Sequence, residues 1–271
     1  MRIVREVLGV WTNTRAIILV ALTAAIYAAV LIPLKAIPII PGLTELRPAN
    51  VWPVVFSLLF GPAAAWGSAI GNTIGDIVGG ILGPGSFFGF FANFFFGLVP
   101  YLLWGRLGFL SSGKKPIMSP KEGQYGRQLL EYLAIALTAS GACAVVLAWG
   151  VDVLALSPFG AFSNIVLLNN FIASAVLGPL LMPLLYRRVE RWGLLYSDLV
   201  GWEDGDAARP DGTLRAAPPS SGVGVVLMFT GIIGAYIVGN MIAFGLLSVG
   251  IGIAAGAGVF LLIFIASLVF F

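Results

Sequence analysis

The chain has 271 residues, of which 59% are hydrophobic and only 10% are charged, with a formal net charge of +3 and a mean hydropathy of +1.00. A soluble domain carries about 25% charged residues, so this composition excludes an ordinary soluble domain and predicts an integral membrane protein. The sequence has no histidine and one cysteine, Cys143, which excludes a histidine proton relay and an intrachain disulfide.

The apolar segments are continuous runs rather than alternating patterns, which indicates membrane helices and not a β-barrel. At about 20 residues per span, the length allows roughly eight helices with their loops. We therefore expect an all-α, polytopic helical bundle.

The first helix is expected over residues 16–34, after a basic segment that holds Arg2, Arg5 and Arg15. That segment resembles the start of a signal peptide, but the apolar run is long and no good cleavage site follows, so we expect the helix to be retained. Ala21, Ala25 and Ala29 form one stripe on this helix. Small residues four apart allow another helix to approach closely, either from a partner or from the same subunit.

A proline-rich loop at residues 35–48 contains Glu45 and Arg47. A short second helix is expected from about residue 49 to residue 60, where Gly61-Pro62 breaks it. The remaining expected helices span about residues 64–82, 87–104, 129–149, 159–186, 223–246 and 249–271. A polar segment at 105–128 separates the helices at 87–104 and 129–149, and another at 187–221 separates those at 159–186 and 223–246.

Asp76 is the most informative residue, because apolar sequence surrounds it on both sides. A carboxylate costs a few kcal/mol in hydrocarbon, so it normally faces a protein interior or a water-filled cavity and marks a functional site. Asn72 lies four residues before it, on the same helix face. The alternative interpretation is a buried hydrogen bond between helices, without a ligand.

The basic residues predict the orientation in the membrane. If the N-terminus is cytoplasmic, every Lys and Arg except Lys35 and Arg47 falls on the cytoplasmic side. The positive-inside rule then predicts that both termini are cytoplasmic in a prokaryotic plasma membrane.

With this topology, polar residues from several segments fall in the outer half of the bundle. Such a set predicts an apolar pocket that captures a small polar molecule from outside through a few placed polar groups. The candidate substrate-binding residues are Glu45, Arg47, Asn50, Asn72, Asp76, Asn93, Asn164 and Asn169.

Several activities are disfavoured. Residues 108–115 nearly match a phosphate-binding loop, but they lack the Ser or Thr that holds magnesium, and Pro116 follows where a helix should start. No acidic pair, Ser/His pair or metal cluster is visible, which argues against an intramembrane enzyme. We expect no cofactor, no metal and no nucleic-acid partner.

A family resemblance rests on PVVFSLLFGPA at residues 53–63 and GSAIGNTIGDIVGG at residues 67–80, together with Ala21 and Ala25. These segments resemble the substrate-binding S-components of energy-coupling factor (ECF) transporters, over about residues 10–190. The resemblance implies a six-helix protein that binds a vitamin or similar micronutrient at the outer face. It also implies a membrane coupling subunit that docks on the alanine stripe, two ATPase subunits, and a first outer loop, residues 35–47, that gates the pocket.

The two C-terminal helices depart from that family pattern. We expect a substrate-binding domain at 1–190, a cytoplasmic linker at 191–221 and a membrane hairpin at 222–271, with few packed contacts across the linker. Gly252 and Gly256 are spaced for docking of the hairpin against helices of the same subunit or of a partner. Two other functions remain open: a membrane carrier or enzyme for an apolar, isoprenoid-like substrate, suggested by the Phe-rich fourth helix, and a purely structural subunit.

Overall fold

The computed structural model describes residues 2–34, 38–40, 44–45, 47–121, 123–199, 219–247 and 252–271. Helices dominate these ranges, which confirms the predicted all-α bundle. In chain order they are α1 (Arg2–Gly9), α2 (Thr14–Leu34), α3 (Val51–Phe60), α4 (Pro62–Val78), α5 (Pro84–Leu103), α6 (Tyr125–Val153), α7 (Phe159–Arg191), α8 (Tyr196–Leu199), α9 (Pro219–Ala243) and α10 (Ile253–Ser267).

Short elements complete the chain. Strands β1 (Pro38–Ile40) and β2 (Thr44–Glu45) pair antiparallel within the expected outer loop, whose other residues lie mostly outside the described part. The 3₁₀ helices are η1 (Val10–Thr12), η2 (Pro48–Asn50), η3 (Gly108–Leu110) and η4 (Leu268–Phe270).

Six helical segments of the described chain are long and apolar enough to cross a membrane. They are Thr14–Pro33, Pro84–Leu103, Tyr125–Val153, Phe159–Leu199, Ser221–Ala243 and Ile253–Phe270. The second and third expected helices, now α3 and α4, are shorter because Gly61-Pro62 divides one apolar stretch into 10 and 17 residues.

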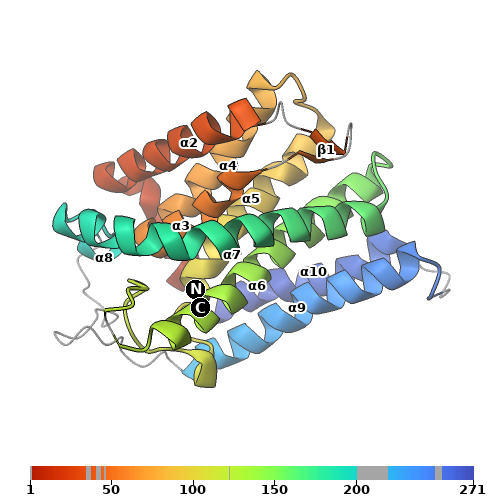
Figure 1. The fold of residues 1–271 in the computed structure, drawn as a ribbon. Coiled ribbons are helices and arrows are strands. Elements are labelled where there is room, and N and C mark those ends of the chain that lie inside the picture. Colours follow the sequence, from red (N-terminus) through yellow and green to blue (C-terminus); the bar gives the residue numbers. More distant parts are fainter. Residues whose placement is uncertain are drawn as a thin grey trace.

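The bundle has two distinct ends (Figure 1). The β1–β2 pair, the α4–α5 and α6–α7 connections and the C-terminal end of α9 lie at one end, which we call the hairpin end. The two termini lie close together toward the other end, the terminal end, and α1 contacts η4 there.

Helix α3 lies at the centre and is almost entirely buried against α4, α5 and α7. Gly61 ends it with a positive φ of 55°. A Cβ atom on Gly61 would lie 2.8 Å from the Tyr196 ring, so glycine both allows the turn and admits α8. The turn therefore fixes where α3 ends and α4 begins.

Helix α2 packs on α4 through two glycines. A Cβ atom on Gly67 would lie 2.4 Å from the Thr23 Cβ, and one on Gly71 would lie 2.9 Å from the Ala24 carbonyl oxygen. This contact buries one face of α2 and leaves Ala21, Ala25 and Ala29 exposed on another face.

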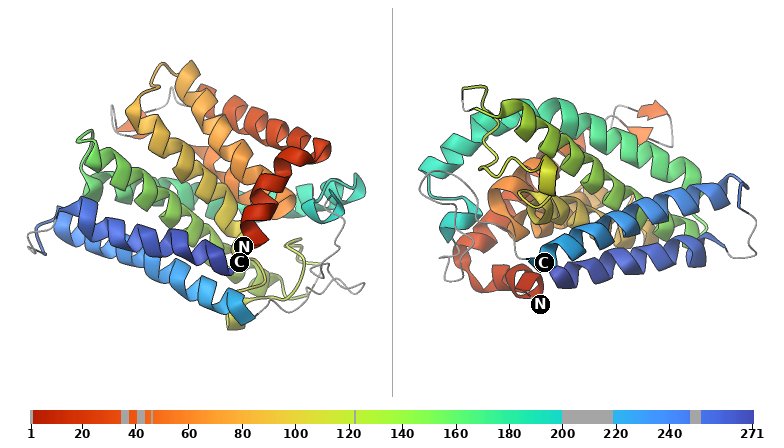
Figure 2. Two further views of the ribbon diagram at one scale, coloured as in Figure 1. Left: turned by 180° about the vertical axis from the view of Figure 1, so that it is seen from behind. Right: turned by 90° about the horizontal axis from the view of Figure 1, so that it is seen from below.

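The C-terminal hairpin α9–α10 packs along α6, with further contacts to α7 (Figure 2). The Phe95 and Phe264 rings meet at 5.0 Å, and the Trp149 Nε1–H donates to the Ala254 carbonyl at 3.1 Å. The expectation of few packed contacts is therefore wrong. Glycines on both sides, Gly141 and Gly239 among them, admit bulky side chains and bring the helices close.

The segment that follows α5 is held on α6 by a buried carboxylate. Glu131 accepts hydrogen bonds from the Gly105 and Ser112 backbone N–H groups, both at 2.7 Å. The Ser112 amide, which a phosphate-binding loop would turn toward a phosphate, is thus already engaged. This geometry supports treating the near-match at residues 108–115 as chance.

Candidate functional site

Tyr27 lies at the centre of a buried polar cluster between the membrane helices. Its side chain is 1% exposed, because α2 turns it toward α3 and α5. The Tyr27 hydroxyl oxygen lies 3.1 Å from Oδ1 of Asn50 and 3.0 Å from Oδ1 of Asn93. Three segments far apart in sequence thus meet at one hydroxyl.

Asn50 connects this hydroxyl to α7. It lies at the junction of η2 and α3, where its side-chain Nδ2 donates to Oδ1 of Asn170. The Ser174 hydroxyl donates to the Asn50 carbonyl at 3.2 Å, and the Tyr132 hydroxyl of α6 donates to the Ser174 carbonyl at 3.1 Å. The start of α3 is therefore fixed by hydrogen bonds rather than by apolar packing alone.

Asn72 and Asp76 form the part of the cluster nearest the hairpin end, since Asp76 lies two residues before the end of α4. The Asn72 Nδ2 lies 3.4 Å from the Asp76 Oδ2, so the pair shares one face as predicted. That face meets α5 at Gly89, where a Cβ atom would lie 3.3 Å from Asn72 Nδ2. Asn93 donates to the Gly89 carbonyl at 2.9 Å within α5, so the two parts of the cluster adjoin at Gly89.

Two charged residues act on this cluster. Arg47, half-buried just before η2, and Asp76 both lie near enough to Tyr27 for their charges to act on its hydroxyl. The cluster therefore combines amide groups and a hydroxyl with one cation and one anion inside an apolar bundle. Among the described residues, no group of His, Cys, Asp and Glu side chains could hold a metal ion.

The structure places the other predicted site residues elsewhere. Asn164 bonds to Asn240 and Tyr236 of α9 and to the Gly160 carbonyl, so it joins α7 to the C-terminal hairpin. Asn169 is half-buried on a face of α7 about 100° from that of Asn170. Glu45 ends β2, and its side chain lies outside the described part of the structure.

Sequence reasoning missed three members of the cluster: Tyr27, Asn170 and Ser174. Tyr27 is a polar group within the aliphatic run of α2, and Asn170 adjoins the predicted Asn169. Both residues stand out in the sequence as polar groups in apolar runs. Helix α7 is apolar on most of its surface, so its hydrophobic periodicity does not show whether Asn169 or Asn170 faces the bundle interior.

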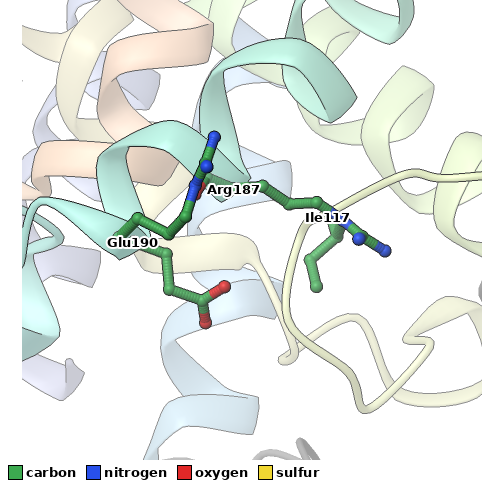
Figure 3. A pocket seen from close by; sticks show the side chains of 4 residues that line it. Ile117, Arg187 and Glu190 are labelled. Carbon is green, nitrogen blue, oxygen red and sulfur yellow. The ribbon is translucent and has the colours of Figure 1, made fainter.

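A separate groove of about 590 Å³ opens at the terminal end of α7 (Figure 3). Its lining residues are Ile117, Arg187, Glu190 and Arg191. Glu190 also forms an ion pair with Lys115, at 3.0 Å. Seventeen residues of α7, or about 25 Å of helical rise, separate Arg187 from Asn170, so this groove is not part of the cluster.

The family assignment follows from the matching region. The model of the QueT transporter family matches residues 17–187, more than half of the chain. The chain belongs to the QueT transporter family. This is an ECF S-component family for a queuosine precursor, which confirms the resemblance to S-components.

The match covers α2 to α7, the helices that supply the whole polar cluster, and it stops before α9 and α10. No curated protein and no solved structure matches the chain. The protein is thus a multi-pass, substrate-specific S-component, and its family implies a substrate and an ECF module as partners.

Proposed function

We propose that this S-component captures a queuosine precursor at the outer face of a prokaryotic plasma membrane. A coupling membrane subunit and two ATPase subunits then drive its import. The family description, which names a queuosine precursor, supports the substrate. Chemically, such a precursor is a 7-deazaguanine, a planar ring with polar edges. The observation that carries the proposal is the convergence of Asn50, Asn72, Asp76 and Asn93 in one buried cluster.

The cluster has the properties that a small-molecule site requires. Most of its surroundings are apolar, and a few polar groups from separate helices are held in defined positions. We assign substrate contact to Arg47, Asn50, Asn72, Asp76 and Asn93. Glu45 and Asn169 remain proposed substrate contacts outside the cluster. The hydrogen bonds of Asn164 to α9 instead favour a role in holding the C-terminal hairpin.

The exposed alanine stripe supports the proposed partner. Ala21, Ala25 and Ala29 present small side chains on a face of α2 that no neighbouring helix buries in the described structure. Helices α9 and α10 pack on α6, on the other side of the bundle from α2, and so leave this face open to the coupling subunit (Figure 1). The shared position of the two termini fits an orientation with both in the cytoplasm.

Binding and uptake measurements test this proposal. The purified full-length protein in detergent should bind 7-deazaguanine that carries a small substituent at position 7, as measured by isothermal titration calorimetry. Cells that express the protein together with an ECF module should accumulate the labelled compound, and a module with inactive ATPases serves as the control. Absence of binding to every 7-deazaguanine tested would overturn the proposed substrate.

A further inference from the structure

The groove at the terminal end of α7 carries more positive than negative charge. Two arginines one helical turn apart on α7, Arg187 and Arg191, line it together with Glu190. Lys115 reaches Glu190 from the segment between α5 and α6, with 3.0 Å between its Nζ and the Glu190 Oε1. Three cations against one carboxylate give this part of the surface a net positive charge, so the groove favours an anionic ligand.

The arginines suit a phosphate group in particular. Both residues are exposed, and the Arg191 Nε–H donates to the Arg187 carbonyl oxygen at 3.2 Å. A guanidinium carries five N–H donors, so Arg191 keeps others for a ligand. Because its donors form a planar fork, a guanidinium binds phosphate oxygens in pairs. A phosphate-bearing anion therefore fits the chemistry of the groove.

The wall of the groove opposite α7 has a fixed conformation. Ile117 lies on the segment that follows α5, and this segment faces α7 (Figure 3). Gln128 of α6 is 1% exposed; its Oε1 accepts from the Met118 backbone N–H at 2.9 Å, and its Nε2 donates to the Lys115 carbonyl at 3.0 Å. These two hydrogen bonds hold the backbone on either side of Ile117. The groove is thus built into the fold.

The groove lies where the apolar surface of α7 ends. No charged residue occurs between Asp152 and Arg187. Over this length α7 exposes an apolar side chain at every fourth position, a set that we call the α7 stripe: Leu168, Ile172, Val176, Leu180 and Leu184. Leu184 and Arg191 lie within about 20° of each other around the helix. Trp192, which is 69% exposed, follows the helix, as is typical of the boundary between membrane and water.

We propose that the groove binds the head group of an anionic phospholipid whose acyl chains lie along the α7 stripe. Arg187 and Arg191 contact the phosphate, and Lys115 neutralises Glu190 beside it. A soluble phosphate ester shares the head-group chemistry, but the apolar stripe that leads to the groove favours a lipid. With both termini cytoplasmic, as proposed, this lipid belongs to the inner leaflet. The inference goes beyond the proposed function and does not depend on which molecule the protein transports.

Lipid competition measured by native mass spectrometry tests this inference. The full-length protein in detergent is mixed with equal amounts of phosphatidylglycerol and phosphatidylcholine that have the same acyl chains. The native protein should prefer phosphatidylglycerol by about tenfold or more, as expected for two cations that face a head group with a net negative charge. The double variant Arg187→Gln/Arg191→Gln should bind the two lipids within about twofold of each other, because that attraction is removed.

Two further variants exclude trivial explanations. The matched control is Arg5→Gln/Arg15→Gln, which removes the same charge from two exposed residues outside the groove and should keep the native preference. Glu190→Gln should act in the opposite direction. It removes the carboxylate that repels a phosphate, so the preference for phosphatidylglycerol should rise. A damaged fold would not produce such a gain.

Three results would overturn the inference. One is an unchanged lipid preference in the groove variant. Another is an equal loss of preference in the control, which would show attraction by total charge instead of by the groove. The third comes from glycerol phosphate, which carries the phosphate without acyl chains. At the same concentration it should not displace phosphatidylglycerol, and displacement would assign the groove to a soluble phosphate ester.

Discussion

Asp76 is the only acidic residue between Arg47 and Tyr101, and it lies in the part of the polar cluster nearest the hairpin end. Its carboxylate contacts Asn72 on its own helix and acts electrostatically on Tyr27. A buried carboxylate inside an apolar helical bundle normally marks a functional site.

We predict that Asp76→Ala weakens substrate binding by about tenfold or more while the protein stays folded. A hydrogen bond to a charged group contributes about 1.5–3 kcal/mol, which gives that magnitude. Isothermal titration calorimetry and a thermal melt of the same sample measure the two effects. Unchanged affinity together with a lower melting temperature would assign Asp76 a purely structural role.

Glu131 is also a buried acid, but unlike Asp76 its role is structural, because both of its oxygens accept backbone hydrogen bonds. It is 0% exposed, and its two carboxylate oxygens bind two backbone amides of the segment after α5. Its side chain binds the segment after α5 and none of the residues assigned to substrate contact.

Glu131→Ala should therefore lower stability without changing substrate affinity. Two buried N–H groups would lose their acceptor, at about 1–3 kcal/mol each. A lower melting temperature with an unchanged Kd is the expected pair of results. A large loss of affinity in a folded protein would show that the segment after α5 influences the site.

At the scale of elements, α2 has two faces with different roles. One face holds Tyr27 and packs on α4, and the other exposes the alanine stripe. The close α2–α4 contact depends on the absence of a side chain at Gly67 and Gly71.

Gly67→Ala should destabilise the bundle, because the added methyl group would lie 2.4 Å from the Thr23 Cβ and 2.9 Å from the Val20 carbonyl oxygen. Overpacking of this kind costs about 1–3 kcal/mol. The matched control is Gly126→Ala, where nothing lies within 4 Å of the added atom. A thermal melt compares the two, and an equal melting temperature for both would contradict the packing argument.

Ala25→Leu should abolish uptake but leave substrate binding unchanged. A leucine on the stripe would hold a partner helix away, whereas the polar cluster lies on the other side of α2. The control is Ala255→Leu, at an alanine of α10 that is also exposed. Cellular uptake, substrate binding and co-purification of the coupling subunit are measured together. Persistent uptake with Ala25→Leu would remove the proposed docking role.

For the whole molecule, the C-terminal hairpin is attached firmly, yet it contributes no residue to the cluster. The Asn164–Asn240 bond, the Trp149–Ala254 bond and the Phe95–Phe264 contact join it to α7, α6 and α5. The hairpin thus packs on the outer surface of the helices that carry the site.

Deleting residues 222–271 should preserve substrate binding but lower the melting temperature. Every residue of the cluster comes from α2 to α7, while removal of the hairpin exposes the apolar surface of α6. The truncated protein in detergent is tested for binding and by thermal melt. Loss of binding in a truncated protein that remains folded would show that the hairpin shapes the pocket.

The sequence by itself determined the membrane class, the helix positions and the family. These features depend on local properties: the hydropathy of each run, the Gly61-Pro62 break, and the four-residue spacing of Asn72 and Asp76. Tertiary structure alone decided which side chains meet. Packing between distant segments decides three features of the structure. It turns Asn170 rather than Asn169 toward Asn50, brings Asn164 against α9, and places the C-terminal hairpin on α6. Membrane helices are apolar on nearly every face, so a helix that packs on protein and one that faces lipid have similar sequences.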